Sequence, residues 1–293
     1  KKILGRSIPS DIKKKTAALM LDRICDTLRN SLDSIIISSF IGLVATTIYG
    51  NYYYIYSAIY GVLLVIGNAL AGSVGNSISC ESVKKNYADL RNFQFLFAWI
   101  NTICTICFIT MYQPFMQLWV GADLMMSDGN MFLFCMYFYL INMNNIRNQY
   151  INGTGMWDRL KFSYVLEAGG NLILNILLGR IWGITGILLA TIITVFLFNY
   201  VLRTHILFLN YFAGESEKRF SVDQLQYALV TIIASGIAFF LSRMNHCGEI
   251  LQLIVGGCLS ILISSMLYLV FFMKTERFFY AKKKVRQILC RTM

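Results

Sequence analysis

The sequence has few charged residues and very little proline or histidine. Only 14% of its 293 residues are Asp, Glu, Lys or Arg, and 57% are hydrophobic. A soluble domain carries about a quarter charged residues. With two prolines in the whole chain, long helices can run uninterrupted. These deficits exclude an ordinary water-soluble domain and predict an all-α polytopic membrane protein.

Residues that carry catalytic, nucleotide or metal chemistry are also scarce. There are two histidines, and no phosphate-binding loop of the G-x-x-x-x-G-K-[ST] type occurs. Cys104 and Cys107 have redox or metal-ligand spacing, but they lack a second pair and fall in an apolar run, where cysteine is usually a small apolar residue. We therefore expect no enzyme activity, no catalytic residue, no metal and no cofactor.

The gaps between basic residues predict the number of membrane spans. Six long stretches contain no Lys or Arg: 30–83, 92–146, 162–179, 181–202, 220–242 and 244–273. Because a helix needs about 20 mostly apolar residues to cross the hydrocarbon, the first two stretches hold two crossings each and the others one. About eight spans are predicted, near 16–42, 46–74, 92–113, 130–150, 160–179, 183–208, 223–243 and 249–273.

The basic residues fall in alternate connections between these spans. One side receives the N-terminal segment, Lys84, Arg147, Arg203 and the tail, whereas the other has only Arg180 and Arg243. This asymmetry predicts that both ends of the sequence are cytoplasmic. The net charge of +11 then reflects topology and contact with membrane lipid, not nucleic-acid binding.

The order of the spans predicts five regions. They are a cytoplasmic basic segment (1–15), a six-helix lobe (16–210), a cytoplasmic linker (211–222), two additional transmembrane helices (223–273) and a cytoplasmic basic amphipathic tail (274–293). In the tail, the apolar residues predicted to lie against the membrane are Phe278, Phe279, Val285, Ile288 and Leu289. A disordered basic end is the alternative. Because the sequence begins with Lys1 rather than Met, we expect it to be a fragment of a longer protein.

The first span carries charges that lipid does not solvate. With a turn of about 100° per residue, six polar residues share an arc of about 120°: Asp22, Arg23, Asp26, Arg29, Asn30 and Asp33. The spacing allows Arg29 to pair with Asp26 and with Asp33.

Two interpretations of this stripe remain open. Either 14–33 lies flat on the cytoplasmic surface and the span begins at Ser34, or one long helix lines a hydrated cavity. The uncharged stretch before a predicted turn at Gly50 is short for a span. Charges at membrane depth usually face a bundle interior or a wet cavity, which favours the second interpretation.

Polar residues in two later spans fit the same cavity. Arg147 ends the fourth span, and the fifth carries Glu167, Asn171 and Asn175 on one face. Glu167 needs a cation or water, and Arg147 is a candidate partner. For Asn171 and Asn175, hydrogen bonding between helices is an equal alternative.

A tyrosine cluster stands at the start of the second span, with the sequence YGNYYYIYSAIY at 49–60. An aromatic belt in the outer leaflet is the favoured interpretation, because tyrosine collects at membrane interfaces. Stacking on sugar rings is the alternative.

Three blocks of the sequence resemble bacterial polysaccharide flippases. LDSIIISSFIGLVATTIYGNYYYIYSAIYGVLLVI (32–66) resembles the D-x-I-I-I-x-x-F-x-G … Y opening of a lobe in that family. QPFMQLWVG (113–121) resembles the P-F-x-x-L-W-x-G outer turn. DRLKFSYVLEAGGNLILNILLGRIWGITGILLATII (158–193) resembles the block K-x-x-x-x-x-E-x-x-x-N-L-x-L-N … G-I-x-G-x-x-x-A-T.

The family is the O-antigen flippase branch of the multidrug, oligosaccharidyl-lipid and polysaccharide exporter superfamily. The resemblance implies the second lobe of a MATE-like exporter plus two extra helices, in the bacterial cytoplasmic (inner) membrane. It implies that a first lobe of the same protein is missing here. It also implies a polysaccharide polymerase as a further partner.

The function implied by the resemblance is transport of a lipid-linked oligosaccharide. A polyprenyl-pyrophosphate-linked repeat unit would cross to the outer leaflet for surface polysaccharide assembly, by alternating access through a charged cavity. The residues expected to bind this substrate are Arg23, Arg29, Asn30 and Arg147. The expected cavity carboxylates or ion-coupling groups are Asp26, Asp33 and Glu167.

Two other functions remain open. A cation-coupled drug or metabolite antiporter of the same superfamily would favour an acidic cavity, and the two arginines of the first span argue mildly against it. A membrane polysaccharide polymerase would need a large outer loop, and the longest outer connection, 113–129, is short.

Reporter fusions test the span count. Fusions at Asp123 and Asn245 are expected to report the periplasmic side, because both positions follow an odd number of predicted crossings. Alkaline phosphatase activity, with a cytoplasmic reporter at the same sites as control, measures this. A cytoplasmic signal at either site would contradict the predicted topology.

Overall fold

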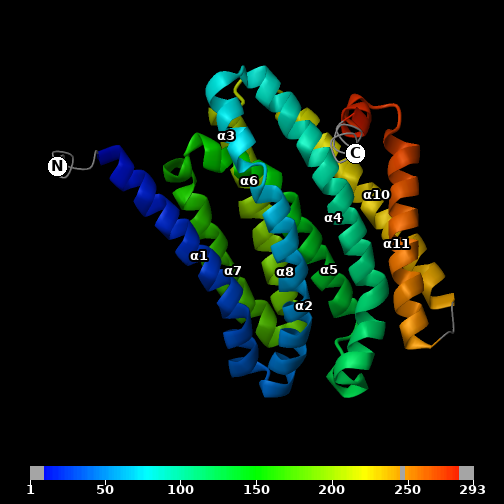
Figure 1. The fold of residues 1–293 in the computed structure, drawn as a ribbon. Helices are drawn as coiled ribbons and strands as arrows, with labels where there is room; N and C mark the ends of the chain where they lie inside the picture. Colours follow the sequence, from blue (N-terminus) through cyan, green and yellow to red (C-terminus); the bar gives the residue numbers. More distant parts are fainter. Residues whose placement is uncertain (1–9, 245–247, 284–293) are drawn as a thin grey trace, which may run out of the picture.

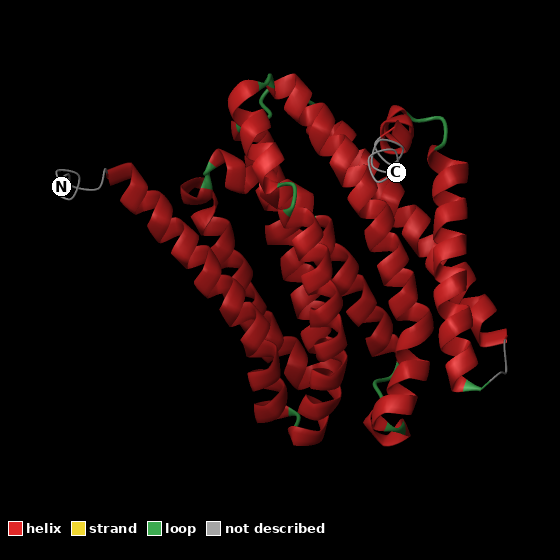
Figure 2. Cartoon of the chain, viewed as in Figure 1, coloured by secondary structure: helices red, strands yellow, loops and turns green. Residues whose placement is uncertain are grey.

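The computed structural model describes residues 10–244 and 248–283, apart from the side chains of Asp11, Asn30 and Glu249. Helices joined by short loops make up these ranges, and no strand occurs in them (Figure 2). The predicted all-α class is confirmed for this part of the chain.

The helices follow one another with few connecting residues. Their bounds are α1 (Ser10–Phe40), α2 (Leu43–Asn68), α3 (Ala71–Cys80), α4 (Val83–Val120), η1 (Ala122–Leu124), α5 (Asp128–Met143), α6 (Asn145–Thr154), α7 (Trp157–Trp182), α8 (Ile184–Thr194), η2 (Val195–Leu202), α9 (Arg203–Asn210), α10 (Glu217–Met244) and α11 (Glu249–Phe272). Residues 276–283 are also helical.

Six helical segments of the described chain are long and apolar enough to cross a membrane, as a multi-pass membrane protein requires. They are Leu43–Cys80, Val83–Val120, Trp157–Trp182, Ile184–Asn210, Glu217–Met244 and Ile250–Phe272. Two of the eight predicted spans are not among them. The helix α1 carries many charges, and α5 ends after 16 residues, where the chain turns at Asn144 into α6.

The helices run up and down the bundle, and their connections gather at its two ends (Figure 1). The start of α1, the α3–α4, α6–α7 and α9–α10 connections and the helix at 276–283 lie at one end. We call this the basic end, because Lys84, Arg159 and Lys218 flank these connections. Within the bundle, α1 packs along α7, α7 on α8, and α8 on α5. The last two helices, α10 and α11, pack on α4 and on each other.

The turn between α1 and α2 lies close to the predicted boundary between spans 16–42 and 46–74, and the turn predicted at Gly50 is wrong. The observed turn falls at Ile41 and Gly42, whereas Gly50 and Asn51 lie inside α2. Gly42 has a φ of 124°, which only glycine adopts readily, and its N–H donates to the carbonyl of Ile37 at 3.0 Å. The same carbonyl accepts from the N–H of Ile41 at 2.9 Å, so two N–H groups of the turn close the end of α1.

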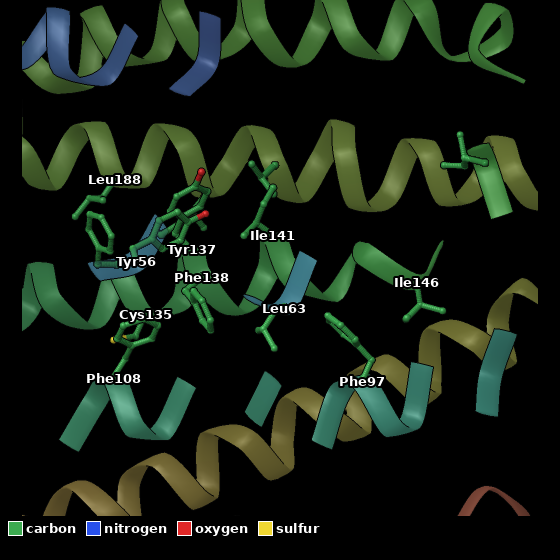
Figure 3. Close-up of a cluster of buried hydrophobic side chains, with 14 of the residues drawn as sticks. Tyr56, Leu63, Phe97, Phe108, Cys135, Tyr137, Phe138, Ile141, Ile146 and Leu188 are labelled. Carbon is green, nitrogen blue, oxygen red and sulfur yellow. The ribbon is translucent and has the colours of Figure 1, made fainter. Parts of the chain in front are cut away.

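Aromatic rings from α2, α4 and α5 fill the centre of the bundle (Figure 3). The ring of Phe138 meets those of Tyr56 and Phe108 edge to face, with centroids 5.7 and 4.6 Å apart. Close packing of this kind drives helix association in lipid, where burying apolar surface gains little by itself.

Helix boundaries differ from prediction near the basic segments. The helix α1 begins at Ser10, inside the predicted segment 1–15, and α10 begins at Glu217, inside the predicted linker 211–222. Phe278 of the tail contacts the ring of Trp99 on α4, with centroids 6.5 Å apart, so it packs on protein. Phe279 is exposed. The other tail residues predicted to face the membrane, Val285, Ile288 and Leu289, lie outside the described residues.

One carboxylate joins the tail helix to the bundle. Asp223 on α10 is buried, and it accepts from Arg91 of α4 at 2.6 Å and from Arg277 at 2.9 Å. Arg277 also donates to the hydroxyl of Tyr227. Two cations on one buried anion satisfy it without exposing it to solvent.

Replacing Asp223 therefore tests this junction. Asp223→Asn is expected to lower the free energy of unfolding by about 3 kcal/mol, because it leaves two part-buried guanidinium groups without a counter-ion. The melting temperature of the purified protein in detergent measures this. Glu81→Gln, which breaks the exposed pair of Glu81 and Lys85, is the matched control and should leave the melting temperature unchanged. Equal melting temperatures for the two variants would contradict the expectation.

Candidate functional site

The charged stripe of α1 faces the inside of the bundle. The helix is unbroken from Ser10 to Phe40, with Arg29 and Asp33 only 5% and 4% exposed. On the opposite face, Ile24 and Leu28 are exposed. The polar side chains of this part of α1 thus face neighbouring helices and its apolar side chains face outward. This arrangement agrees with the predicted long helix and not with a charged half lying apart from the bundle.

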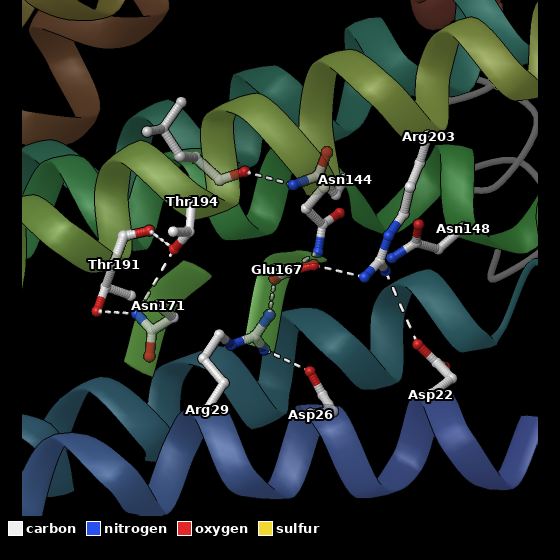
Figure 4. Close-up of polar contacts among 12 residues, drawn as sticks. Asp22, Asp26, Arg29, Asn144, Asn148, Glu167, Asn171, Thr191, Thr194 and Arg203 are labelled. Carbon is white, nitrogen blue, oxygen red and sulfur yellow. Dashed lines mark hydrogen bonds and ion pairs between the residues drawn. The ribbon is translucent and has the colours of Figure 1, made fainter. Parts of the chain in front are cut away.

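Glu167 is the centre of an ion network that joins three helical segments. Its side chain is buried, and Figure 4 shows it between Arg29 of α1 and Arg203 of α9. Both arginines donate to the carboxylate, Arg29 to Oε1 and Arg203 to Oε2. Asn199 of η2 adds a hydrogen bond from Nδ2 to Oε1 at 3.2 Å.

Each arginine of the network has a second acidic neighbour on α1. Arg29 donates to Asp26, as the spacing predicts, and Arg203 lies 3.8 Å from Asp22. Arg203 also stacks its guanidinium over the ring of Tyr164 at 4.4 Å. Two arginines and three carboxylates therefore form one connected network (Figure 4).

Arg203 is the member that the sequence analysis missed. It was counted among the residues that flank a span on the basic side. In the structure the continuous helical segment Ile184–Asn210 runs on past Arg203, the first residue of α9, and Arg203 is only 8% exposed. The sequence signal for this position is the helical pattern that continues through 203–210. A cation that flanks a span should come after the last helical turn, and Arg203 comes before it.

Arg147 is buried but does not pair with Glu167, so the predicted partnership is wrong. Its Nη1 donates to the backbone carbonyls of Asn199 and Tyr200, at 2.7 and 3.1 Å, and to Thr204 Oγ1 at 3.0 Å. Its Nη2 donates to the side-chain oxygens of Asn148 and Asn199, at 2.9 and 2.8 Å. The side chain lies behind η2 and does not line the cavity described below.

Asp33 occupies a second buried polar cluster. It makes no ion pair with Arg29 or with any other described residue, so the predicted pairing of Arg29 with Asp33 is wrong. Three neutral donors surround its carboxylate: Asn175 at 2.7 Å, Tyr49 at 3.0 Å and Thr191 at 3.3 Å. Helices α2, α7 and α8 therefore all converge on one carboxylate of α1.

A cavity of about 240 Å³ opens beside the ion network. It lies toward the basic end, since the last turns of α2 and α6 line it. Its charged lining residues are Asp22, Arg23, Asp26, Arg29 and Arg203, and three cations against two anions give a formal charge of +1. Arg23 is exposed at the cavity, and the side chain of Asn30 lies outside the described part of the structure.

Tyrosines form one wall of this cavity. Tyr53, Tyr56 and Tyr60 of α2 stack in succession, with centroids 5.3 and 5.8 Å apart, and Tyr137 of α5 stacks on Tyr56 at 5.1 Å. The predicted aromatic belt is therefore wrong for these residues, and of the cluster Tyr54 alone is largely exposed, at 67%. Tyrosine identity does not reveal which face of α2 meets the bundle.

The cavity combines groups that bind two kinds of ligand. Arginines bind phosphate and carboxylate groups through paired N–H donors. Tyrosine faces and the amides of Asn145, Asn148 and Gln149 offer contacts for hydroxyl-bearing rings. Among the described residues, no group of His, Cys, Asp and Glu is placed to hold a metal ion. The arrangement suits a ligand that is anionic at one end and hydroxylated at the other.

Comparison with protein-family models, with curated proteins and with solved structures finds no match for this chain. Its function is therefore inferred from the geometry of the cavity and the ion network.

Glu167 is expected to be more important for stability than its neighbour Asp26. Glu167→Gln should lower the free energy of unfolding by about 3 kcal/mol, because two buried arginines lose their shared anion. Asp26→Asn should cost about 1 kcal/mol or less, since water reaches that half-exposed side chain. Thermal unfolding in detergent compares the two. A larger loss for Asp26→Asn would contradict the central place of Glu167.

Proposed function

We propose that this chain is part of an exporter that moves a polyprenyl-pyrophosphate-linked oligosaccharide across a bacterial cytoplasmic membrane. The single observation that carries the proposal is the cavity, in which arginines stand beside stacked tyrosines and amides among packed helices. A lipid-linked oligosaccharide has the matching chemistry, with a diphosphate next to a chain of hydroxylated rings.

Each part of the ligand has a counterpart in the cavity. The diphosphate would bind Arg29 and Arg203, with Arg23 at the rim, because charge-assisted bonds offset the cost of desolvating an anion. Sugar rings would contact Tyr53, Tyr60 and the neighbouring amides. The polyprenyl tail would remain in the lipid, which spares the protein the burial of a long apolar chain.

Several further features belong to the same proposal. The chain would be the second lobe of a MATE-like exporter with two added helices and eight crossings, and α1 and α5–α6 would complete the count. Both described ends would be cytoplasmic, since basic residues collect at that end of the bundle. A first lobe of the same protein would close the cavity, and a polysaccharide polymerase would receive the product.

Asp33 supports a second candidate, a cation-coupled antiporter of drugs or metabolites. A buried carboxylate held by neutral donors alone can take up a proton or a small cation without breaking an ion pair. The same group would couple a flippase to an ion gradient, so the two candidates differ in substrate. Drug-resistance profiling of a deletion strain separates them.

Loss of Arg29 tests the flippase directly. Arg29→Gln is expected to reduce export at least about tenfold, because a charge-assisted bond to the diphosphate is lost, and to accumulate lipid-linked repeat units on the cytoplasmic leaflet. Leaflet-specific labelling of the repeat unit and surface polysaccharide in a deletion strain complemented with each variant measure this. Arg159→Gln, at an exposed arginine outside the cavity, is the control. Normal surface polysaccharide in a stably inserted Arg29→Gln variant would overturn the proposal.

A further inference from the structure

Arg147 is a buried cation with no carboxylate partner among the described residues. Its side chain is 1% exposed, and all the acceptors that it contacts are neutral. Burying a guanidinium without a counter-ion is costly, so its five hydrogen bonds must provide most of the compensation. Two of these acceptors belong to Asn199, one in its backbone and one in its side chain.

The contact between Arg147 and Asn199 fixes the direction of the Asn199 amide. A guanidinium group has only donors, so the atom of Asn199 that faces Arg147 must be the acceptor Oδ1. The Nδ2 group of the same amide then points the other way, to Glu167 Oε1. Arg147 thus determines that Asn199 presents a donor, and not an acceptor, to the anion held by Arg29 and Arg203.

The second role of Arg147 concerns the backbone of η2. This segment is a π-helix over Val195–Leu202, a rare geometry that widens each turn and frequently marks functional sites. Its carbonyls at Asn199 and Tyr200 accept from Arg147. Because a π-helical turn holds more residues than an α-helical turn, a return to α geometry would rotate the helix that follows. Arg203 is the first residue of that helix, so its direction depends on η2.

We propose that Arg147 is a positioning residue for a phosphate-binding cradle made by Arg29, Arg203 and Asn199. It acts from behind the cavity wall, where it sets the donor of Asn199 and holds the π-helical turn that aims Arg203. In the described conformation Glu167 occupies the cradle, and its carboxylate lies where a phosphate group of the ligand would bind. The cradle rests on the proposed function, whereas the positioning of η2 by Arg147 does not.

The affinity for inorganic pyrophosphate tests the proposal, with the full protein in lipid nanodiscs. Arg147→Met and Asn199→Ala are each expected to raise the Kd about tenfold, which corresponds to the loss of one hydrogen bond to a charged group. Because one of the two contributions of Arg147 passes through the Asn199 amide, the double variant should raise the Kd by less than the product of the two single effects. Arg147→Lys, which keeps a cationic donor, should restore most of the affinity.

Hydrogen exchange of the backbone amides at 195–204 is the second readout. Arg147→Met is expected to change their protection, because η2 loses the donor that holds its carbonyls. Arg159→Met is the matched control, since it also removes an arginine bonded to an asparagine, Asn210, but does not touch η2. If Arg147→Met does not fold, Arg147→Lys and Asn199→Asp replace it, and Asn199→Asp should weaken binding more than Asn199→Ala.

The outcomes separate this proposal from the function on which it partly rests. Unchanged exchange at 195–204 in Arg147→Met would overturn the positioning role, and so would fully additive effects on the Kd. Absence of pyrophosphate binding by the unaltered protein would overturn the cradle together with the proposed substrate. A changed exchange pattern in that case would still support the control of η2 by Arg147.

Discussion

The carboxylate of Glu167 is the contact on which the arrangement of the cavity depends. Arg29 approaches it from α1 and Arg203 from α9, and removing it would leave each of these buried cations with a single acidic neighbour. The cost of burying these charges is best offset when all three groups are present in the right geometry. The ion network therefore specifies how α1, α7 and α9 face one another more than it adds to stability.

The polar groups around this network fall into two sets: those that line the cavity and those that contact only other protein groups. Groups that meet the cavity, such as Arg23 and Tyr53, are accessible to a ligand. Groups behind it, such as Arg147, contact only other protein groups. Asp33 belongs to neither set, because its neutral shell isolates it from the arginines. A change of charge at Asp33 would act first on α2, α7 and α8, because side chains of these helices donate to its carboxylate.

The parts of the site that could be predicted from sequence are those determined by local periodicity. The stripe on α1 and the pair of Arg29 with Asp26 follow from helical spacing alone. The partners of Glu167 and Asp33 could not be predicted, because they come from helices far away in the sequence. The burial of the tyrosines was not predicted for the same reason, since the orientation of α2 about its axis is set by its neighbours. The turn predicted at Gly50 was wrong because glycine followed by asparagine is a turn signal that a long helix can override.

The last two helices pack mainly on α4, and α10 also contacts α9 and α5. Helices α10 and α11 pack on α4, and the ion pairs of Asp223 tie α4, α10 and the tail helix together. A tilt of α4 would therefore move α11 and the tail helix with it, whereas α10 is also held by α9 and α5. A spectroscopic probe on the exposed side of α11 would therefore report a tilt of α4. The probe would lie away from the cavity and would not disturb ligand binding there.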